Sequence, residues 1–191
     1  ALLVGLASVA LATAAGTLVG IPSGYFGRWL DFVLQRLVDT LMAFPTIVLA
    51  IGVVAVLGTG TLNVAAALAV VLTPAVARVV RSATLVVTAS QYIEAARCVG
   101  CTDTYIMRRH VLPNVLPPTI VVATVAIGNA IVAEASLSFL GLGTQPPYPS
   151  WGNMLSGPAR SYLEQAPWLA IFPGLALSIV VLAFNLLGDT L

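Results

Sequence analysis

Five apolar stretches, each long enough to form a membrane helix, constrain this chain more than any other feature. They occupy residues 2–21, 40–57, 61–77, 119–140 and 168–187. A helix of about 17 to 25 apolar residues crosses the hydrocarbon layer of a membrane. Only 8% of the residues are charged, compared with about 25% in soluble domains. The sequence therefore predicts an all-α integral membrane protein with five transmembrane helices, forming a single transmembrane domain over residues 1–191.

The arginines predict the orientation of the chain, because basic residues collect in cytoplasmic loops beside membrane spans. Five spans place every basic residue except Arg160 on the same side. We therefore expect a multi-pass protein of the inner or plasma membrane, with residues 22–39 and 78–114 in the cytoplasm and an extracytoplasmic loop at 141–167. The chain begins without Met at the edge of an apolar stretch, so we expect it to be part of a longer protein.

The residue inventory excludes several kinds of chemistry. All 8 basic residues are Arg, which removes both a P-loop lysine and a Schiff-base lysine. The chain is therefore not expected to be an enzyme or to hydrolyse nucleotides itself, and we predict no cofactor in it. Cys98 and Cys101 are spaced as in some zinc sites, with His110 nearby, but such a site usually needs four ligands. We interpret the cysteines as small residues beside a turn.

Small residues and prolines predict how the membrane helices pack. Small residues recur every four positions at Ser8, Ala12, Gly16, Gly20 and Gly24. Such a stripe lets two helix backbones approach closely, although membrane helices are rich in Gly and Ala in any case. Pro45, Pro74 and Pro173 lie within the second, third and fifth stretches. They predict kinked helices, since proline removes a backbone donor.

Glu134 is the one acidic residue within a predicted span. A carboxylate inside the membrane is usually functional and faces the bundle interior or a water-filled cavity. Glu134 is therefore a candidate residue of a translocation pathway or of its outer gate. The alternative is a structural carboxylate near the outer interface, hydrogen-bonded or paired with Arg160.

The charge-dense segment 91–114 predicts two helices joined by a turn. Residues 82–99 suit a helix, and Gly100 suits its end, because glycine adopts the left-handed conformation found there. A short second helix of about eight residues would follow. Thr102 would cap it, Asp103 would lie at its start, where the helix dipole favours a negative charge, and Pro113 would prevent its continuation.

A helix that short is unstable alone in water, so the sequence predicts that it packs against something. Tyr105, Ile106 and Met107 lie at its middle with charged residues on both sides. This pattern is typical of an anchor in a protein interface. An amphipathic helix resting on the lipid surface is the alternative.

The same segment resembles a known family. Glu94-Ala95-Ala96, Gly100 and His110-Val111-Leu112-Pro113 are similar to the EAA loop of the membrane subunits of binding-protein-dependent ABC importers. The usual motif has Ile where His110 stands. Residues 24–45, 134–155 and 166–191 resemble the second permease subunit of dipeptide, oligopeptide and nickel importers.

The resemblance implies a permease subunit that forms part of a pathway for peptides or a related small solute such as a nickel chelate. It implies six spans in the full-length protein, so that an N-terminal span is missing here. The expected partners are a second homologous permease, two ATPases that bind ATP and Mg²⁺, an extracytoplasmic solute-binding protein and the lipid bilayer, with no nucleic acid. The alternative is a channel or secondary transporter that needs no ATPase.

The resemblance also implies which residues couple the permease to the ATPases, through a short coupling helix that docks on them. The residues that match this loop are Glu94, Ala95, Ala96, Gly100, Cys101, Thr102, Asp103, Thr104, Tyr105, Ile106, Met107, Arg108, Arg109, Leu112 and Pro113.

Overall fold

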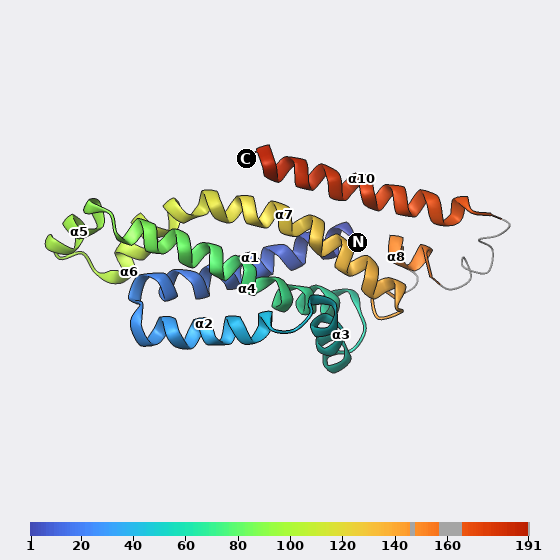
Figure 1. The fold of residues 1–191 in the computed structure, drawn as a ribbon, viewed down its shortest axis with the longest axis horizontal. Helices are drawn as coiled ribbons and strands as arrows, with labels where there is room; N and C mark the ends of the chain where they lie inside the picture. The colour runs from blue at the N-terminus through green and yellow to red at the C-terminus, as the bar shows by residue number, and fades with distance from the viewer. Residues whose placement is uncertain (146–147, 157–165, 191) are drawn as a thin grey trace.

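The computed structural model describes residues 1–145, 148–156 and 166–190, and its regular elements there are all helical (Figure 1). Most of the long helices run roughly along the longest axis of the molecule, whereas the segment Thr46–Leu57 lies across it (Figure 1). Their bounds are α1 Leu2–Phe26, α2 Arg28–Met42, α3 Thr46–Leu57, α4 Thr61–Thr88, α7 Leu112–Phe139 and α10 Trp168–Thr190. The short elements are α5 Gln91–Cys98, α6 Asp103–Ile106, a π-turn Met107–Val111 and α8 Trp151–Met154.

Four helical segments of the described chain are long and apolar enough to cross a membrane, or five if the bent pair of α2 and α3 counts as one. The four are α1, α4, α10 and the run from α6 through α7, Asp103–Phe139. They contain the first, third, fourth and fifth predicted stretches, which confirms an all-α membrane fold. The third is longer than predicted, because α4 continues past Arg78 and Arg81 to Thr88.

The second predicted stretch, residues 40–57, is not one continuous helix. Helix α2 ends at Met42, and α3 begins after Pro45 at an angle of 96°. Proline disfavours the helical conformation of the residue before it, so Pro45 ends a helix here and does not merely kink one. Helix α3 has 12 residues, or about 18 Å at 1.5 Å per residue, which is shorter than the hydrocarbon layer.

Helices α1 and α4 pack along the small-residue stripe, as the sequence predicts. Ser8, Ala12, Gly16, Gly20 and Gly24 are all buried. A Cβ atom added at Gly16 or Gly20 would lie 2.7 Å from the Cβ of Val76 or Val80, which is too close for any side chain. The two backbones are therefore as near to each other as glycine allows, and the pair forms the centre of the bundle.

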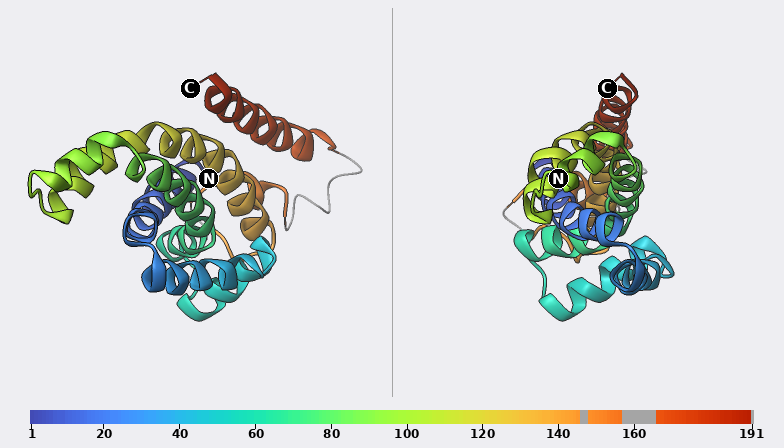
Figure 2. Two further views of the ribbon diagram at one scale, coloured as in Figure 1. Left: turned by 60° about the vertical axis from the view of Figure 1, so that its left-hand side comes forward. Right: turned by 90° about the vertical axis from the view of Figure 1, so that its left-hand side faces the viewer.

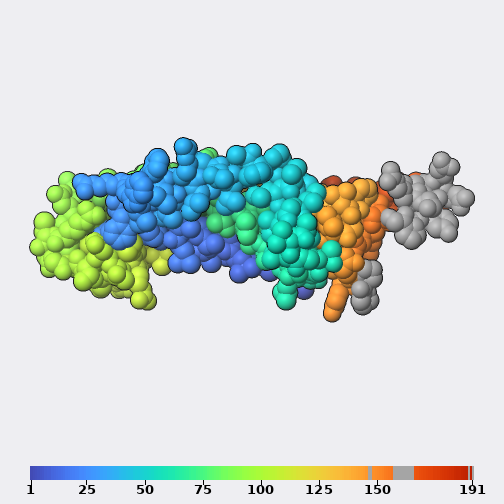
Figure 3. All heavy atoms as spheres, turned by 90° about the horizontal axis from the view of Figure 1, so that it is seen from below, coloured from blue at the N-terminus to red at the C-terminus, as the bar shows by residue number. Residues whose placement is uncertain are grey.

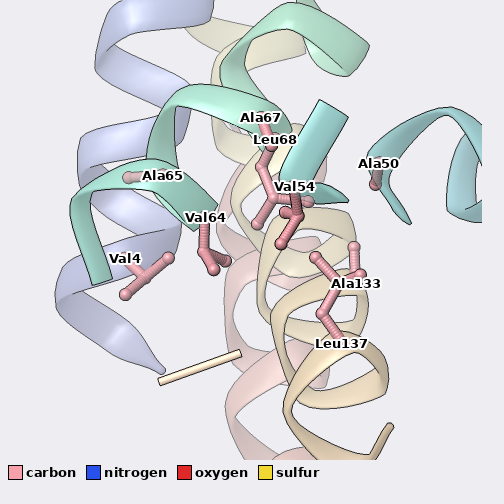
Figure 4. Packing of buried hydrophobic residues seen from close by; sticks show 9 residues of the cluster. All are labelled: Val4, Ala50, Val54, Val64, Ala65, Ala67, Leu68, Ala133 and Leu137. Carbon is pink, nitrogen blue, oxygen red and sulfur yellow. The ribbon is translucent and has the colours of Figure 1, made fainter. Parts of the chain in front are cut away.

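The remaining long helices surround this pair. Helix α7 contacts both α1 and α4, while α10 contacts α7 at the margin of the bundle (Figure 2). Helices α2 and α3 cover the face seen in Figure 3. At one end of the molecule α3 and α4 pack on α1 and α7 through Val54, Leu68 and Leu137, with six further valine and alanine residues around them (Figure 4). This arrangement leaves α5 and α6 projecting at the opposite end.

Candidate functional site at the charged end

The segment between α4 and α7 folds as two helical arms joined at Gly100. The first arm differs from the predicted helix at 82–99, because α4 ends at Thr88 and α5 begins after Ser90. Serine favours the position before a helix, where its backbone is extended, and Ser90 has φ −81° and ψ 147°. The helix is therefore interrupted one turn before the Glu94-Ala95-Ala96 motif.

Gly100 ends the first arm as predicted. Its φ is +81°, and its N–H donates to the Arg97 carbonyl at 3.0 Å while the Cys101 N–H donates to the Ala96 carbonyl at 3.1 Å. This pair of hydrogen bonds is the Schellman arrangement that closes a helix. Cys98 and Cys101 thus belong to the turn. In the described ranges, no three His, Cys, Asp or Glu side chains come close enough to share a metal ion.

The second arm begins as predicted but does not end at Pro113. Thr102 caps it by accepting the Tyr105 N–H at 3.4 Å. The helix then widens into the π-turn and runs into α7, with Pro113 in the first turn of α7. Proline is tolerated at the start of a helix, and the Asn114 side chain donates to the His110 carbonyl at 2.6 Å. The short helix is therefore the beginning of a membrane helix and not an isolated one.

Burial separates the predicted coupling residues into an exposed set and an inner set. The exposed residues are Glu94, Ala95, Gly100, Thr102, Asp103, Thr104, Tyr105, Arg108, Arg109 and Pro113. Cys101, Met107 and Leu112 are half-buried, and Ala96 and Ile106 are buried. The predicted anchor of three apolar residues is therefore wrong in part, because Ile106 points into the protein and Tyr105 is the member that is 52% exposed.

A hydrophobic cluster holds both arms against the bundle. Ile93 of α5, Ile106 of α6 and Val111 of the π-turn are fully buried, together with Ile21 of α1 and Val80 of α4. Buried aliphatic side chains of this kind each contribute about 1.5 to 3 kcal/mol. The exposed residues of the segment therefore rest on a well-packed hydrophobic cluster.

Tyr25, near the end of α1, makes the polar contacts between the bundle and this segment. Its hydroxyl donates to Asp103 Oδ1 at 2.7 Å, and the Arg97 guanidinium lies 5.2 Å from the centre of its ring. Tyr25 therefore touches the last turn of α5 and the first turn of α6. No sequence pattern predicts this contact, because Tyr25 and Asp103 are 78 positions apart.

A second polar network joins α2 to α1 and α4. Asp31 accepts two hydrogen bonds from Arg81, each at 2.6 Å, and a third from the buried Ser23 at 2.5 Å. Arg78 and Asp39 form an ion pair at 2.5 Å. A groove of about 490 Å³ beside Arg36 is lined by Asp31, Asp39, Arg78 and Arg81. In the sequence these arginines serve only as markers of orientation, but in the fold Arg78 and Arg81 also hold α2 in position.

Glu134 lies in α7 towards the opposite end of the molecule. It is fully buried, and its Oε1 accepts hydrogen bonds from Ser138 at 2.8 Å, Ser150 at 3.1 Å and Thr144 at 3.2 Å. The carboxylate thereby joins α7 to the segment that follows it. Arg160, the predicted ion-pair partner, lies outside the described residues.

Known proteins match both the sequence and the fold. The chain is 49% identical over 187 residues to a glutathione transport system permease protein of Pectobacterium atrosepticum, covering 98% of this chain and 62% of the relative. It is 44% identical, with the same coverages, to a dipeptide transport system permease protein of Alkalihalophilus pseudofirmus. The chain thus spans less than two thirds of the length of these curated relatives.

The solved structures support the fold alone. A chain of the MetNI methionine ABC transporter in an inward-facing conformation superimposes with a TM-score of 0.73 at 23% identity, covering 99% of this chain and 91% of that chain. The model of the family described as binding-protein-dependent transport system inner membrane component matches residues 16–191. This protein therefore belongs to that family of inner membrane components.

Proposed function

We propose that the chain is part of one permease subunit of an ATP-driven importer and that it forms part of the pathway for the transported solute. The observation that carries the proposal is the family match over residues 16–191. The relatives named for glutathione and dipeptide transport support a peptide or a related small solute, such as a nickel chelate, as the substrate class. We propose the inner or plasma membrane as its location.

The proposed complex contains a second homologous permease, two ATPase subunits and an extracytoplasmic solute-binding protein. ATP and Mg²⁺ are bound by the ATPases, because this chain has no lysine for a P-loop. Large apolar side chains lie exposed along α1, α3 and α10, including Leu18, Val56 and Ile179. Such surfaces need lipid or another subunit to cover them, which fits a multi-pass subunit of a membrane complex.

The proposed coupling surface is the exposed set of the 94–113 segment, which faces the cytoplasm and docks on an ATPase. An exposed tyrosine with charged residues around it resembles the centre and rim of a protein interface. Tyr105 provides that centre, and Glu94, Arg108 and Arg109 provide the charges. Ala96 and Ile106 are buried beneath this surface and fix it to the bundle.

In this proposal, ATP-driven closure of the ATPases displaces the docked segment. The displacement passes directly into α7, because α6, the π-turn and α7 form one continuous helical run. Close-packed interfaces do not deform continuously, so the helices move largely as rigid bodies and open the pathway to alternate sides.

The test is Tyr105→Asp in the full-length permease, assembled with its partners in liposomes. A carboxylate at the centre of the docking surface should lower solute uptake at least about tenfold, since central interface residues cost 2 kcal/mol or more when lost. ATP hydrolysis by the ATPases should continue. Tyr105→Phe is the matched control and should transport normally. Normal uptake by Tyr105→Asp would refute the coupling assignment.

A further inference from the structure

Tyr25 occupies an unusual place between the bundle and the coupling segment. The residue is only 9% exposed, yet its hydroxyl donates to an exposed residue, Asp103, at 2.7 Å. A buried tyrosine hydroxyl needs a hydrogen-bond partner. Asp103, by contrast, is exposed and would be hydrated without Tyr25. The hydrogen bond therefore does little to solvate Asp103, and its effect is to fix where the first turn of α6 lies.

Tyr25 also contacts Arg97 in α5, the first arm of the segment. The guanidinium carbon lies 5.2 Å from the ring centre, within the range of a cation–π interaction. Arg97 is in the last turn of α5, and Asp103 is in the first turn of α6. One side chain of α1 thus holds both sides of the turn at Gly100.

The end of α1 that carries Tyr25 cannot move independently of α4. A Cβ atom at Gly24, the residue before Tyr25, would lie 2.7 Å from Thr84 Cβ and 2.8 Å from the Arg81 carbonyl oxygen. A displacement delivered to Tyr25 is therefore delivered to α1 and α4 together. The continuous run from α6 into α7 provides a separate route that reaches α7.

We propose that Tyr25 is the positioning residue through which the coupling segment moves the α1–α4 pair. This inference rests on the proposed function, since it assumes that the segment is displaced by an ATPase. When the hydroxyl is absent, the segment still drives α7 but the α1–α4 pair follows less closely. ATP is then hydrolysed with less solute transported.

The main test is Tyr25→Phe in the full-length permease, assembled with its partner subunits in liposomes. Phenylalanine keeps the ring, its packing and its contact with Arg97, so the fold is retained. We expect uptake of the probes glutathione and dialanine, per ATP hydrolysed, to fall about threefold or more, in line with the loss of one hydrogen bond. Tyr92→Phe, which removes an exposed hydroxyl from α5, is the matched control and should not change the ratio.

A double substitution separates the hydrogen bond from other effects of the tyrosine. If the bond to Asp103 is what matters, adding Tyr25→Phe to Asp103→Ala should cause no further loss of transport per ATP. Additive losses from the two substitutions, or an unchanged ratio in Tyr25→Phe alone, would overturn the inference.

The two cysteines of the chain supply a measurement that does not depend on the substrate. Cys98 is exposed, and Cys101 is half-buried against the hydrophobic cluster beside α6. Tyr25→Phe should raise the maleimide labelling rate of Cys101 about threefold and leave that of Cys98 unchanged. An unchanged labelling rate of Cys101 would show that the Tyr25–Asp103 hydrogen bond does not hold the first turn of α6 in place. If Tyr105→Asp fails to uncouple transport, the proposed coupling surface fails, whatever Tyr25→Phe does.

Discussion

At Glu134 a carboxylate with no exposed surface accepts hydrogen bonds from three hydroxyl groups. Burying a carboxylate is costly unless it is hydrogen-bonded. All three donors meet Oε1, and Oε2 has no hydrogen-bond partner among the described residues. Two of the donors, Thr144 and Ser150, come from the segment after α7, so the carboxylate organises that segment. Gly152 of α8 also packs tightly against α7, since a Cβ atom there would lie 2.1 Å from the Ala135 carbonyl oxygen. We therefore expect Glu134 to hold the end of the protein that contains α8 in shape.

Glu134→Ala should remove the shared acceptor and leave three buried hydroxyls to find other partners. Each unsatisfied buried group costs about 1 to 3 kcal/mol, so thermal unfolding of the purified complex should begin at a lower temperature and uptake should fall. Glu134→Gln keeps a carbonyl oxygen and should lose less than half as much stability. Unchanged uptake and stability in the alanine variant would exclude a role for Glu134 in either the pathway or the fold.

The sequence placed Glu134 in an apolar helix and offered a hydrogen-bonded carboxylate as one alternative, but it identified none of the three donors. Ser138 lies four residues along the same helix, so a helical spacing argument reaches it. Thr144 and Ser150 lie beyond the end of α7, and their approach depends on how the chain folds back. Tyr25 and Asp103 illustrate the same limit, because a contact between distant segments leaves no local pattern.

Among the helices, the prolines illustrate why local sequence does not fix where a helix ends. Pro45 separates α2 from α3, whereas Pro74 and Pro173 lie within α4 and α10 as predicted. Pro113 was predicted to end a helix but lies in the first turn of α7. Before Pro113 the helix widens into the π-turn, where the Leu112 N–H donates to the Met107 carbonyl, and the helix continues through Pro113. Apolar length, by contrast, predicted four of the spans correctly.

The contact between α1 and α4 supplies a prediction about a pair of helices. Gly20→Ala places a Cβ 2.7 Å from Val80 Cβ and 2.8 Å from the Ala77 carbonyl oxygen, so the helices must separate. Overpacking of this kind costs about 1 to 3 kcal/mol, which should lower the unfolding temperature of the detergent-solubilised permease. Gly52→Ala in α3 is the matched control, because no atom lies within 4 Å of the added Cβ. Equal stability of the two variants would contradict the packing.

Taken as a whole, the molecule is elongated, with its charged segment at one end and α8 at the other (Figure 1). Charge distribution alone predicted that these two regions lie on opposite sides of the membrane, and the fold separates them as that prediction requires. The arrangement of the helices around α1 and α4 was not predicted. This arrangement depends on which helix faces pack against each other, and a nearly uniform apolar stretch does not specify those faces.

The orientation of the whole molecule can be tested with its own thiols. We expect a membrane-impermeant maleimide to label Cys98, which is exposed in α5, in inside-out vesicles and not in intact spheroplasts, because basic loops face the cytoplasm. The permease should be expressed without its ATPases, so that a docked subunit cannot shield the thiol, and any cysteine elsewhere in the full-length protein should be replaced. Tyr148→Cys, at an exposed position of the opposite end, combined with Cys98→Ser and Cys101→Ser, is the matched control and should give the reverse pattern. Labelling of Cys98 in intact spheroplasts would place the coupling segment outside the cell, where no ATPase could reach it.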